Sequence, residues 1–246
     1  MNRFLKVFGN KNCNVIAMVH VDALPGTPDY KGNWRSIVDK AIREAQIYVK
    51  HKVDAILIEN MHDVPYLPSR LLGPETVACL ARISNEIRQT VPAEIPCGLQ
   101  ILASGNKQAL AVAKACDLQF IRAEGFVFAH IADEGYTDAC AGELLRYRRQ
   151  IDADNLLIFT DIKKKHSSHV ITQDVSLLET AKTAEFFLTD GIVITGSGVT
   201  TENLKQYYTK AKAVIVGSHF KVKGHWANEI CEKTLSGFMN EINELK

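Results

Sequence analysis

Short apolar runs alternate with longer amphipathic stretches along the whole chain. Each run is rich in β-branched residues and ends in polar residues, which is the pattern of a buried strand followed by a loop. The seven strands predicted in this way are 15–19, 55–58, 97–102, 118–121, 156–160, 191–195 and 213–216. The helices predicted between and after them are 33–50, 74–90, 106–115, 139–150, 174–187, 201–210 and 227–244.

The helical stretches show start signals as well as periodicity. Apolar residues recur at three- and four-residue spacing in 33–50 and 74–90, which places them on one face of each helix. Pro74 predicts a first helical turn, because proline has no N–H to lose there. Asn106 and Asp174 are predicted N-caps.

Strands that are apolar on both faces and alternate with helices predict a parallel sheet covered by helices. The alternatives are a closed TIM (β/α)8-type barrel and a doubly wound open sheet. The open sheet normally carries a glycine-rich turn after its first strand, whereas here residues 20–28 form a proline-containing loop. We therefore expect residues 1–246 to form a single α/β-barrel domain.

The strand count differs from that of a complete barrel. A TIM barrel has eight β/α units, and only seven are found here. Residues 196–212 have room for one loop and one short helix but not for a further strand. The sequence therefore predicts a barrel of this type with only seven units.

Composition excludes several classes of function. The net charge is +1 and the isoelectric point is about 7.6, so no field of one sign would attract nucleic acid or a membrane surface. No apolar run reaches the length of a membrane span. We expect neither nucleic-acid nor membrane partners, whereas assembly into a homo-oligomer is left open.

The six cysteines show no Cys-x-x-Cys pair, which argues against a zinc ribbon or a redox motif. They are predicted to be reduced, as in an intracellular compartment. Phe4, Leu5, Val7 and Phe8 predict a short helix that docks on the domain. The expected location is cytoplasmic, with the mitochondrial matrix as the alternative.

Polar residues follow every predicted strand. Because the carboxyl ends of barrel strands meet around one cavity, these residues are expected to form a ring at its mouth. The ring members are His20 and Asp22; Glu59, Asn60 and Asp63; Gln100; Arg122 and Glu124; Asp161, Lys163, Lys165 and His166; Thr195 to Ser197; and Gly217, Ser218 and Lys221.

Two constellations in the ring suggest acid/base or covalent chemistry. Glu59 and Asp161 follow non-adjacent strands, and paired carboxyls in a partly buried site can divide into an acid and a base. Residues 161–166 read DIKKKH, in which a lysine could lose its proton and act as a nucleophile. A solvated turn explains the lysine run equally well.

A metal site and a phosphate site are two further possibilities. His20, Asp161, His166 and His169, with His130 or Asp133, are ligand types for zinc or a harder ion, although no cofactor is the favoured expectation. Glycine-rich turns near a helix start bind anions through backbone N–H groups. The candidate phosphate-binding residues are Gly196, Ser197, Gly198, Gly217 and Ser218.

Several of these motifs together resemble the BtpA family of phosphate-binding TIM barrels. They are MVHVDALPGTP at 18–28, IENMHDVP at 58–65, DEG at 133–135 with LRYR at 145–148, DIKKKH at 161–166 and DGIVITG at 190–196. The resemblance covers residues 4–225 and implies a barrel without an export signal. The motif residues that it matches are His20, Pro25, Gly26, Glu59, Asn60, Asp63, Arg122, Asp133, Glu134, Gly135, Asp161, Lys165, His166, Thr195 and Gly196.

One departure from the family pattern coincides with the low strand count. Family members have a helix and a seventh strand between the Thr-Gly-Ser and Gly-Ser-Gly-Val-Thr motifs, and here the two motifs are merged at 195–200. Roughly 25 residues, about one β/α unit, are therefore expected to be missing. An alternative transcript, an incorrect gene model and a real deletion are all consistent with this pattern.

The resemblance leaves two classes of function open. One is an enzyme acting on a small phosphorylated sugar or nucleoside-like substrate, as a nucleosidase-like hydrolase or a sugar-phosphate lyase or isomerase. The other is a non-catalytic assembly factor, because a family member is associated with photosystem I biogenesis; an inactive shortened isoform is a further reading. For the enzyme, the expected catalytic residues are Glu59, Asp161, Lys165 and His166. The expected substrate-binding residues are His20, Asn60, Asp63, Arg122, Glu124 and Thr195.

Overall fold

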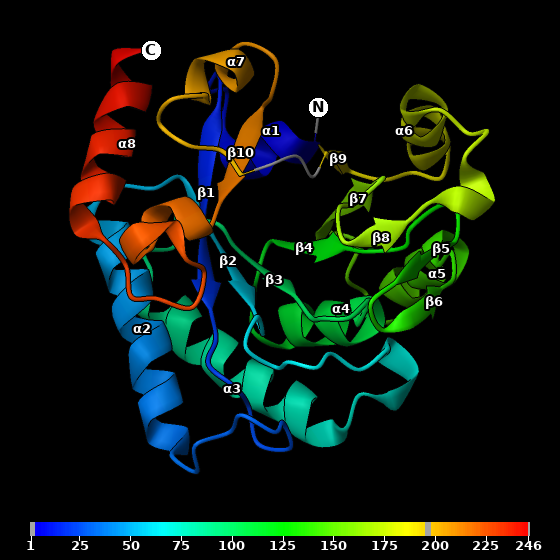
Figure 1. Ribbon diagram of the computed structural model, residues 1–246, viewed down its shortest axis with the longest axis horizontal. Helices are drawn as coiled ribbons and strands as arrows, with labels where there is room; N and C mark the ends of the chain where they lie inside the picture. Colours follow the sequence, from blue (N-terminus) through cyan, green and yellow to red (C-terminus); the bar gives the residue numbers. More distant parts are fainter. Residues whose placement is uncertain (1–2, 195–197, 246) are drawn as a thin grey trace.

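A curved parallel sheet of seven strands forms the centre of the protein, and the computed structural model describes residues 3–194 and 198–245 (Figure 1). The strands pair in the order β10-β1-β2-β3-β4-β7-β9. Their bounds are β1 Asn14–His20, β2 Ala55–Glu59, β3 Cys97–Gln100, β4 Phe120–Ala123, β7 Leu157–Ile162, β9 Gly191–Ile194 and β10 Ala213–Val216.

A helix follows each of these strands, and Figure 1 shows the helices outside the curved sheet. They are α2 Trp34–Lys50, α3 Pro74–Thr90, α4 Asn106–Ala115, α5 Ala141–Gln150, α6 Leu177–Phe186, α7 Leu204–Tyr208 and α8 Glu232–Glu244. The prediction of a TIM-type α/β barrel with seven β/α units is therefore confirmed.

The two faces of the sheet belong to different cores. The larger apolar cluster lies between the sheet and the outer helices, and it takes alternate residues of β1, from Val15 to Val19, together with Leu80 of α3. The smaller cluster takes the other residues of the strands, such as Ile16 and Leu57. Because a strand points alternate side chains to opposite faces, a strand buried on both faces is apolar throughout, which explains the runs seen in the sequence.

The short N-terminal helix α1 (Arg3–Phe8) packs on the smaller core, as predicted. Phe4 stacks on Phe8 at a centroid distance of 4.6 Å. Phe8 in turn lies 5.5 Å from Phe120 and 5.8 Å from Phe159. The helix therefore closes the apolar interior with aromatic rings.

A second, small antiparallel sheet was not predicted. It has the order β6-β5-β8 and is formed by β5 (His130–Ala132), β6 (Gly135–Thr137) and β8 (Ser167–Ser168). These strands are two or three residues long, too short for any alternation of polar and apolar residues to be recognised.

The large sheet is open on one side. Within the described residues, β9 pairs only with β7, and β10 pairs only with β1. Large apolar side chains are exposed on and around α6 and β9, beside this opening. They are Leu177, Leu178, Phe186, Phe187, Leu188, Ile192 and Ile194. An absent neighbouring unit accounts for this exposure, since each unit of a barrel covers its neighbours.

Two predicted helix caps are wrong. Gly105 precedes helix α4, so Asn106 is its first residue and its side chain instead bonds the backbone of Glu124. Helix α6 begins after Ser176, which forms a capping box with Glu179. These reciprocal hydrogen bonds satisfy two backbone N–H donors. The N-cap of α6 is therefore Ser176, two residues after the predicted Asp174.

Candidate functional site

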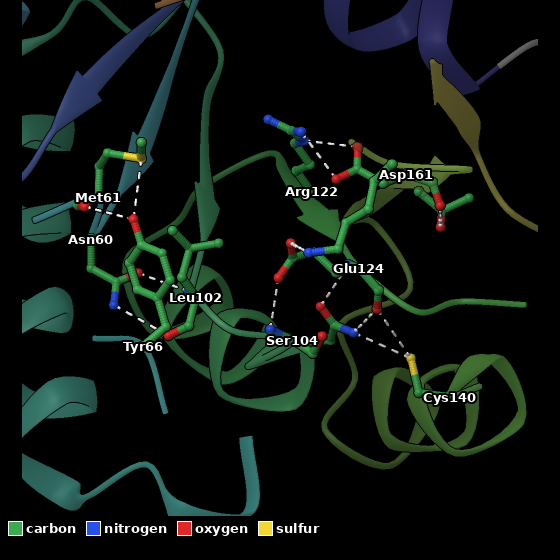
Figure 2. A network of polar contacts seen from close by, with 12 residues as sticks. Asn60, Met61, Tyr66, Leu102, Ser104, Arg122, Glu124, Cys140 and Asp161 are labelled. Atoms are coloured by element: carbon green, nitrogen blue, oxygen red, sulfur yellow. Dashed lines mark hydrogen bonds and ion pairs between the residues drawn. The ribbon is translucent and has the colours of Figure 1, made fainter. Parts of the chain in front are cut away.

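Parallel pairing brings polar side chains from several strand ends to the mouth of the barrel. Glu59 lies beside His20 in the β1–β2 register and beside Gln100 in the β2–β3 register. Arg122 of β4 meets Asp161 of β7 through two bonds, Nε to Oδ1 and Nη2 to Oδ2, each of 3.0 Å (Figure 2). Five of the expected ring positions are thus adjacent in space.

Glu59 is the most unusual group at the mouth. It is 5% exposed, and no hydrogen bond to its carboxyl group is found within the described residues. Burial raises the pKa of Glu59 to about 7, with Arg122 opposing the shift and Glu124 and Asp161 adding to it. A carboxyl group with a pKa near neutrality can both donate and accept a proton at physiological pH.

His20 lies against Glu59 and has a defined tautomer. Its Nδ1 is 3.0 Å from the carbonyl oxygen of Trp226, which can only accept, so Nδ1 carries the proton. Burial lowers the pKa of His20 to about 4, and the ring is neutral with Nε2 as an acceptor. This Nε2 lies 3.9 Å from Oε2 of Glu59.

Gly217 is in contact with this histidine. A Cβ at position 217 would lie 3.1 Å from Nε2 of His20 and 3.4 Å from Sδ of Met18. A larger residue would therefore crowd the ring that faces Glu59. Gly217 thus connects the expected phosphate corner to the buried carboxyl group by close packing.

Glu124 is held by two donors in the described residues. Its Oε2 accepts from the backbone N–H of Ser104 at 2.8 Å, and its Oε1 accepts from Nζ of Lys164 at 2.9 Å (Figure 2). Lys164 is a functional candidate that the sequence pattern did not single out. Only the turn after β7 decides which lysine of the run 163–165 points to the mouth.

Asn60 and Asp63 support the loops around the mouth. Asn60 bonds Asp63 at 2.8 Å and both the N–H and the carbonyl group of Leu102. Asp63 also accepts from the backbone N–H of Leu24 at 2.8 Å. These bonds join the loops that follow β1, β2 and β3, which is a positioning role within the protein.

Lys165 and His166 are both exposed, and the structure does not bring them together with Glu59. Lys163 donates to the carbonyl oxygen of Thr172 at 2.8 Å. A catalytic role for Lys165 and His166 stays a prediction.

The expected phosphate corner is described in part. Thr195, Gly196 and Ser197 lie outside the described residues, while Gly198 and Ser218 are exposed. The loops after β9 and β10 meet where Nε2 of His219 lies 3.2 Å from the N atom and 3.0 Å from Oγ1 of Thr201. The two glycine-containing turns are therefore connected by a direct side-chain contact.

Across residues 3–194 and 198–245, no group of three or more His, Cys, Asp or Glu side chains has the geometry of a metal site. His20, Asp161, His166 and His169 are not gathered into such a cluster. The six cysteines are free. In the same described part of the chain, no helix is both long and apolar enough to cross a membrane.

Two further polar groups lie near the mouth: Tyr66, which the sequence analysis did not single out, and Gln100, which it placed in the ring. Tyr66 donates to the carbonyl oxygen of Met61 at 2.8 Å (Figure 2), and burial, with Glu59 nearby, raises the pKa of its hydroxyl group. The Oε1 atom of Gln100 is buried without a partner in the described structure. An unpartnered buried acceptor is expected to meet a ligand or an ordered water.

Fold and polar strand ends together define an α/β-barrel protein of the TIM type. The family model described as the BtpA family matches residues 11–197 and 174–244. The chain belongs to the BtpA family.

Relatives are found in distant organisms. A Caenorhabditis elegans protein, described as uncharacterized and mitochondrial, is 42% identical over 270 residues, covering 98% of this chain and 97% of the worm protein. The photosystem I biogenesis protein BtpA of Synechocystis is 28% identical, covering 94% of this chain and 88% of that protein.

The fold also resembles a solved enzyme structure. N-(5'-phosphoribosyl)anthranilate isomerase from Pyrococcus furiosus superposes with a TM-score of 0.55 at 13% identity, covering 94% of this chain and 99% of that one. At this identity the likeness concerns the fold alone.

The comparisons are consistent with the predicted absence of about one β/α unit. The family model matches in two segments that overlap at 174–197. The alignment to the worm protein has 270 positions against the 246 residues of this chain, so at least 24 positions have no residue here. Both observations fit the merged motif and the open side of the sheet.

Proposed function

We propose that this protein is an enzyme that acts on a small phosphorylated sugar or nucleoside-like substrate through acid/base chemistry at the barrel mouth. The observation that carries the proposal is Glu59, a buried carboxyl group without a hydrogen bond in the described structure and with a pKa of about 7. Keeping such a group buried lowers stability, and pKa shifts of this kind are characteristic of catalytic acids and bases.

In this proposal Glu59 transfers a proton to or from the substrate. Nε2 of His20 faces the carboxyl group from 3.9 Å, which is longer than a hydrogen bond, and it is the unprotonated nitrogen because the proton of the ring is fixed on Nδ1 by Trp226. The bidentate pair with Arg122 keeps Asp161 oriented, so Asp161 contacts substrate through lone pairs not used by Arg122. Lys164 and Glu124 line the same mouth.

The phosphate group of the substrate would bind at the turns after β9 and β10. Support comes from Gly198, Gly217 and Ser218, and from the contact between His219 and Thr201 that joins the two turns. Solved structures with this fold include an enzyme named for a phosphoribosyl substrate, which makes a sugar phosphate a reasonable first probe.

Two assays distinguish the reaction classes. An isomerase or lyase removes a proton next to a carbonyl group, so D-ribose 5-phosphate in D2O should take up deuterium in the presence of the protein. A nucleosidase should instead release free base from a nucleoside. Glu59→Gln should abolish either activity while ligand still raises the melting temperature, because a ligand that binds only the native state must stabilise it.

The control is Glu94→Gln at an exposed position, which should react like the unmodified protein. Absence of any thermal shift with phosphate, sugar phosphates or nucleosides would contradict the proposal. The alternative is an assembly role, suggested by the name of the Synechocystis relative. That role predicts a large partner that co-purifies equally with the native chain and with Glu59→Gln.

A further inference from the structure

The small sheet presents one polar face beside the barrel mouth. In its antiparallel register Ile131 pairs with Ser168 and Ala132 pairs with Ser167. Because side chains alternate along each strand, the positions on the other face from Ile131 and Ser168 are those of His130, His169 and Ser167. The rings of the two histidines are 5.2 Å apart.

Both histidines line a pocket that reaches the site described above. The other lining residues include Gly125, Asp161, Lys163, Lys164, Thr172 and Thr180. Asp161 and Lys164 are shared with the mouth of the barrel. The face of the small sheet is therefore continuous with the proposed catalytic site.

Buried polar atoms without partners concentrate here. His130 is 5% exposed, and its Nε2 makes no hydrogen bond within the described residues. Oγ of Ser167 and Oε1 of Glu134 are also buried and have no hydrogen-bond partner within the described residues. An unsatisfied buried polar atom costs about 1–3 kcal/mol, so each of the three is expected to meet a ligand or an ordered water.

The hydrogen-bonding character of this face can be assigned. Burial, with Lys164 and His169 nearby, lowers the pKa of His130 to about 4, and the ring makes its one bond to the backbone of Phe128. Its free Nε2 is then an acceptor. His169 donates from Nε2 to the carbonyl oxygen of Lys164 at 3.0 Å, which leaves Nδ1 as a second acceptor.

The unpartnered acceptor of His130 requires a donor on the ligand. The charges around the pocket are balanced, because Lys164 pairs with Glu124 at 2.9 Å and Asp161 lines the same pocket. A hydroxyl group supplies a donor without adding a further charge to this balance. The pocket has a volume of about 20 Å³, so a single sugar hydroxyl group fits it better than a second phosphate or an amine.

We propose that His130, His169 and Ser167 form a subsite that binds a hydroxyl group of a sugar, separate from the phosphate corner. This inference rests on the proposed function and specifies the end of the substrate that lies under the small sheet. Calorimetric titration with D-ribose 5-phosphate, inorganic phosphate and D-ribose tests it. The variants are His130→Leu, which removes the acceptor, and His130→Gln, which keeps one.

We expect His130→Leu to weaken binding of D-ribose 5-phosphate about tenfold, the effect of one buried hydrogen bond left unmade, and to leave inorganic phosphate unchanged. His130→Gln should recover most of the loss, which a purely structural role would not predict. Ile131→Ser, on the other face of the same strand, is the matched control and should bind normally. If His130→Leu does not fold, Ser167→Ala should give a loss of about threefold.

The outcomes separate the two proposals. Equal weakening of phosphate and sugar phosphate by His130→Leu, or no weakening at all, overturns the subsite and leaves the proposed function. Binding of D-ribose that depends on His130, without any binding of phosphate compounds, supports the subsite and overturns the phosphorylated substrate. If none of the three probes binds the native protein, the subsite is wrong, and the proposed function is wrong as well when nucleosides also give no thermal shift.

Discussion

Nε2 of His20 lies 3.9 Å from Oε2 of Glu59, and the two groups titrate away from their usual ranges in opposite directions. Burial raises the pKa of Glu59 to about 7 and lowers that of His20 to about 4. The neutral forms of both groups are therefore favoured between these values. With both groups neutral, no net charge is buried between them at these pH values.

The raised pKa of Glu59 should make stability depend on pH. The folded protein binds this proton more tightly than the unfolded chain, so the contribution of Glu59 to stability is largest below pH 4.5 and is lost as pH rises to about 7. Glu59→Gln removes this dependence. Between pH 5 and pH 8, the free energy of unfolding of the native chain should drop by about 2 kcal/mol relative to the variant.

Urea denaturation at the two pH values measures this difference. His20 is present in both proteins, so its own titration cancels to first order. Glu94→Gln should follow the native chain at both values, because residue 94 is exposed. A pH-independent difference between the native chain and Glu59→Gln would show that Glu59 titrates normally.

Asp161→Asn should destabilise the protein strongly. The substitution leaves the buried guanidinium of Arg122 without its bidentate partner, and removal of one member of a buried pair costs about 3–5 kcal/mol. Asp29→Asn, in an exposed pair with Lys31, should cost less than about 1 kcal/mol. Chemical denaturation of both variants checks the contrast, and equal losses would argue against a buried pair at the mouth.

Phe8→Ala should cost about 3 kcal/mol or more. The ring packs on Phe120 and Phe159 inside the curved sheet, so its loss leaves a cavity at the end of the barrel. Lys6→Ala lies on the exposed side of the same helix and serves as control. Matching melting temperatures for the two variants would mean that α1 does not stay docked in solution.

Polar substitutions beside the open edge should lower surface hydrophobicity without a loss of stability. Phe186 is 80% exposed and Leu188 is 68% exposed. Leu188 also has a positive φ of 63°, which asparagine tolerates better than leucine. Phe186→Gln with Leu188→Asn should reduce binding of an apolar dye and keep the melting temperature the same or higher.

Leu144→Asn provides the contrasting case, because Leu144 is fully buried. Its replacement should cost several kcal/mol through burial of an unsatisfied amide. If the exposed-site double variant is as destabilised as Leu144→Asn, another part of the protein covers α6 in solution.

The architecture could be predicted from the pattern of apolar and polar residues alone. Strands buried on both faces leave continuous apolar runs, and helices that cover them leave three- and four-residue spacing, so β/α order and the count of seven could be read directly. The polar ends of the strands likewise predicted that His20, Glu59, Arg122 and Asp161 lie around one mouth, because parallel strands end at the same edge of a sheet.

The protonation states and the roles of these groups, in contrast, depend on the folded structure. The pKa of Glu59, the tautomer of His20 and the supporting roles of Asn60 and Asp63 depend on burial and on partners that are distant in sequence. Lys164, and not Lys165, contacts Glu124 at the mouth because of the path of the turn after β7. Short strands such as β5 and β8 are specified by their pairing with each other, and local sequence carries no periodic signal for that pairing.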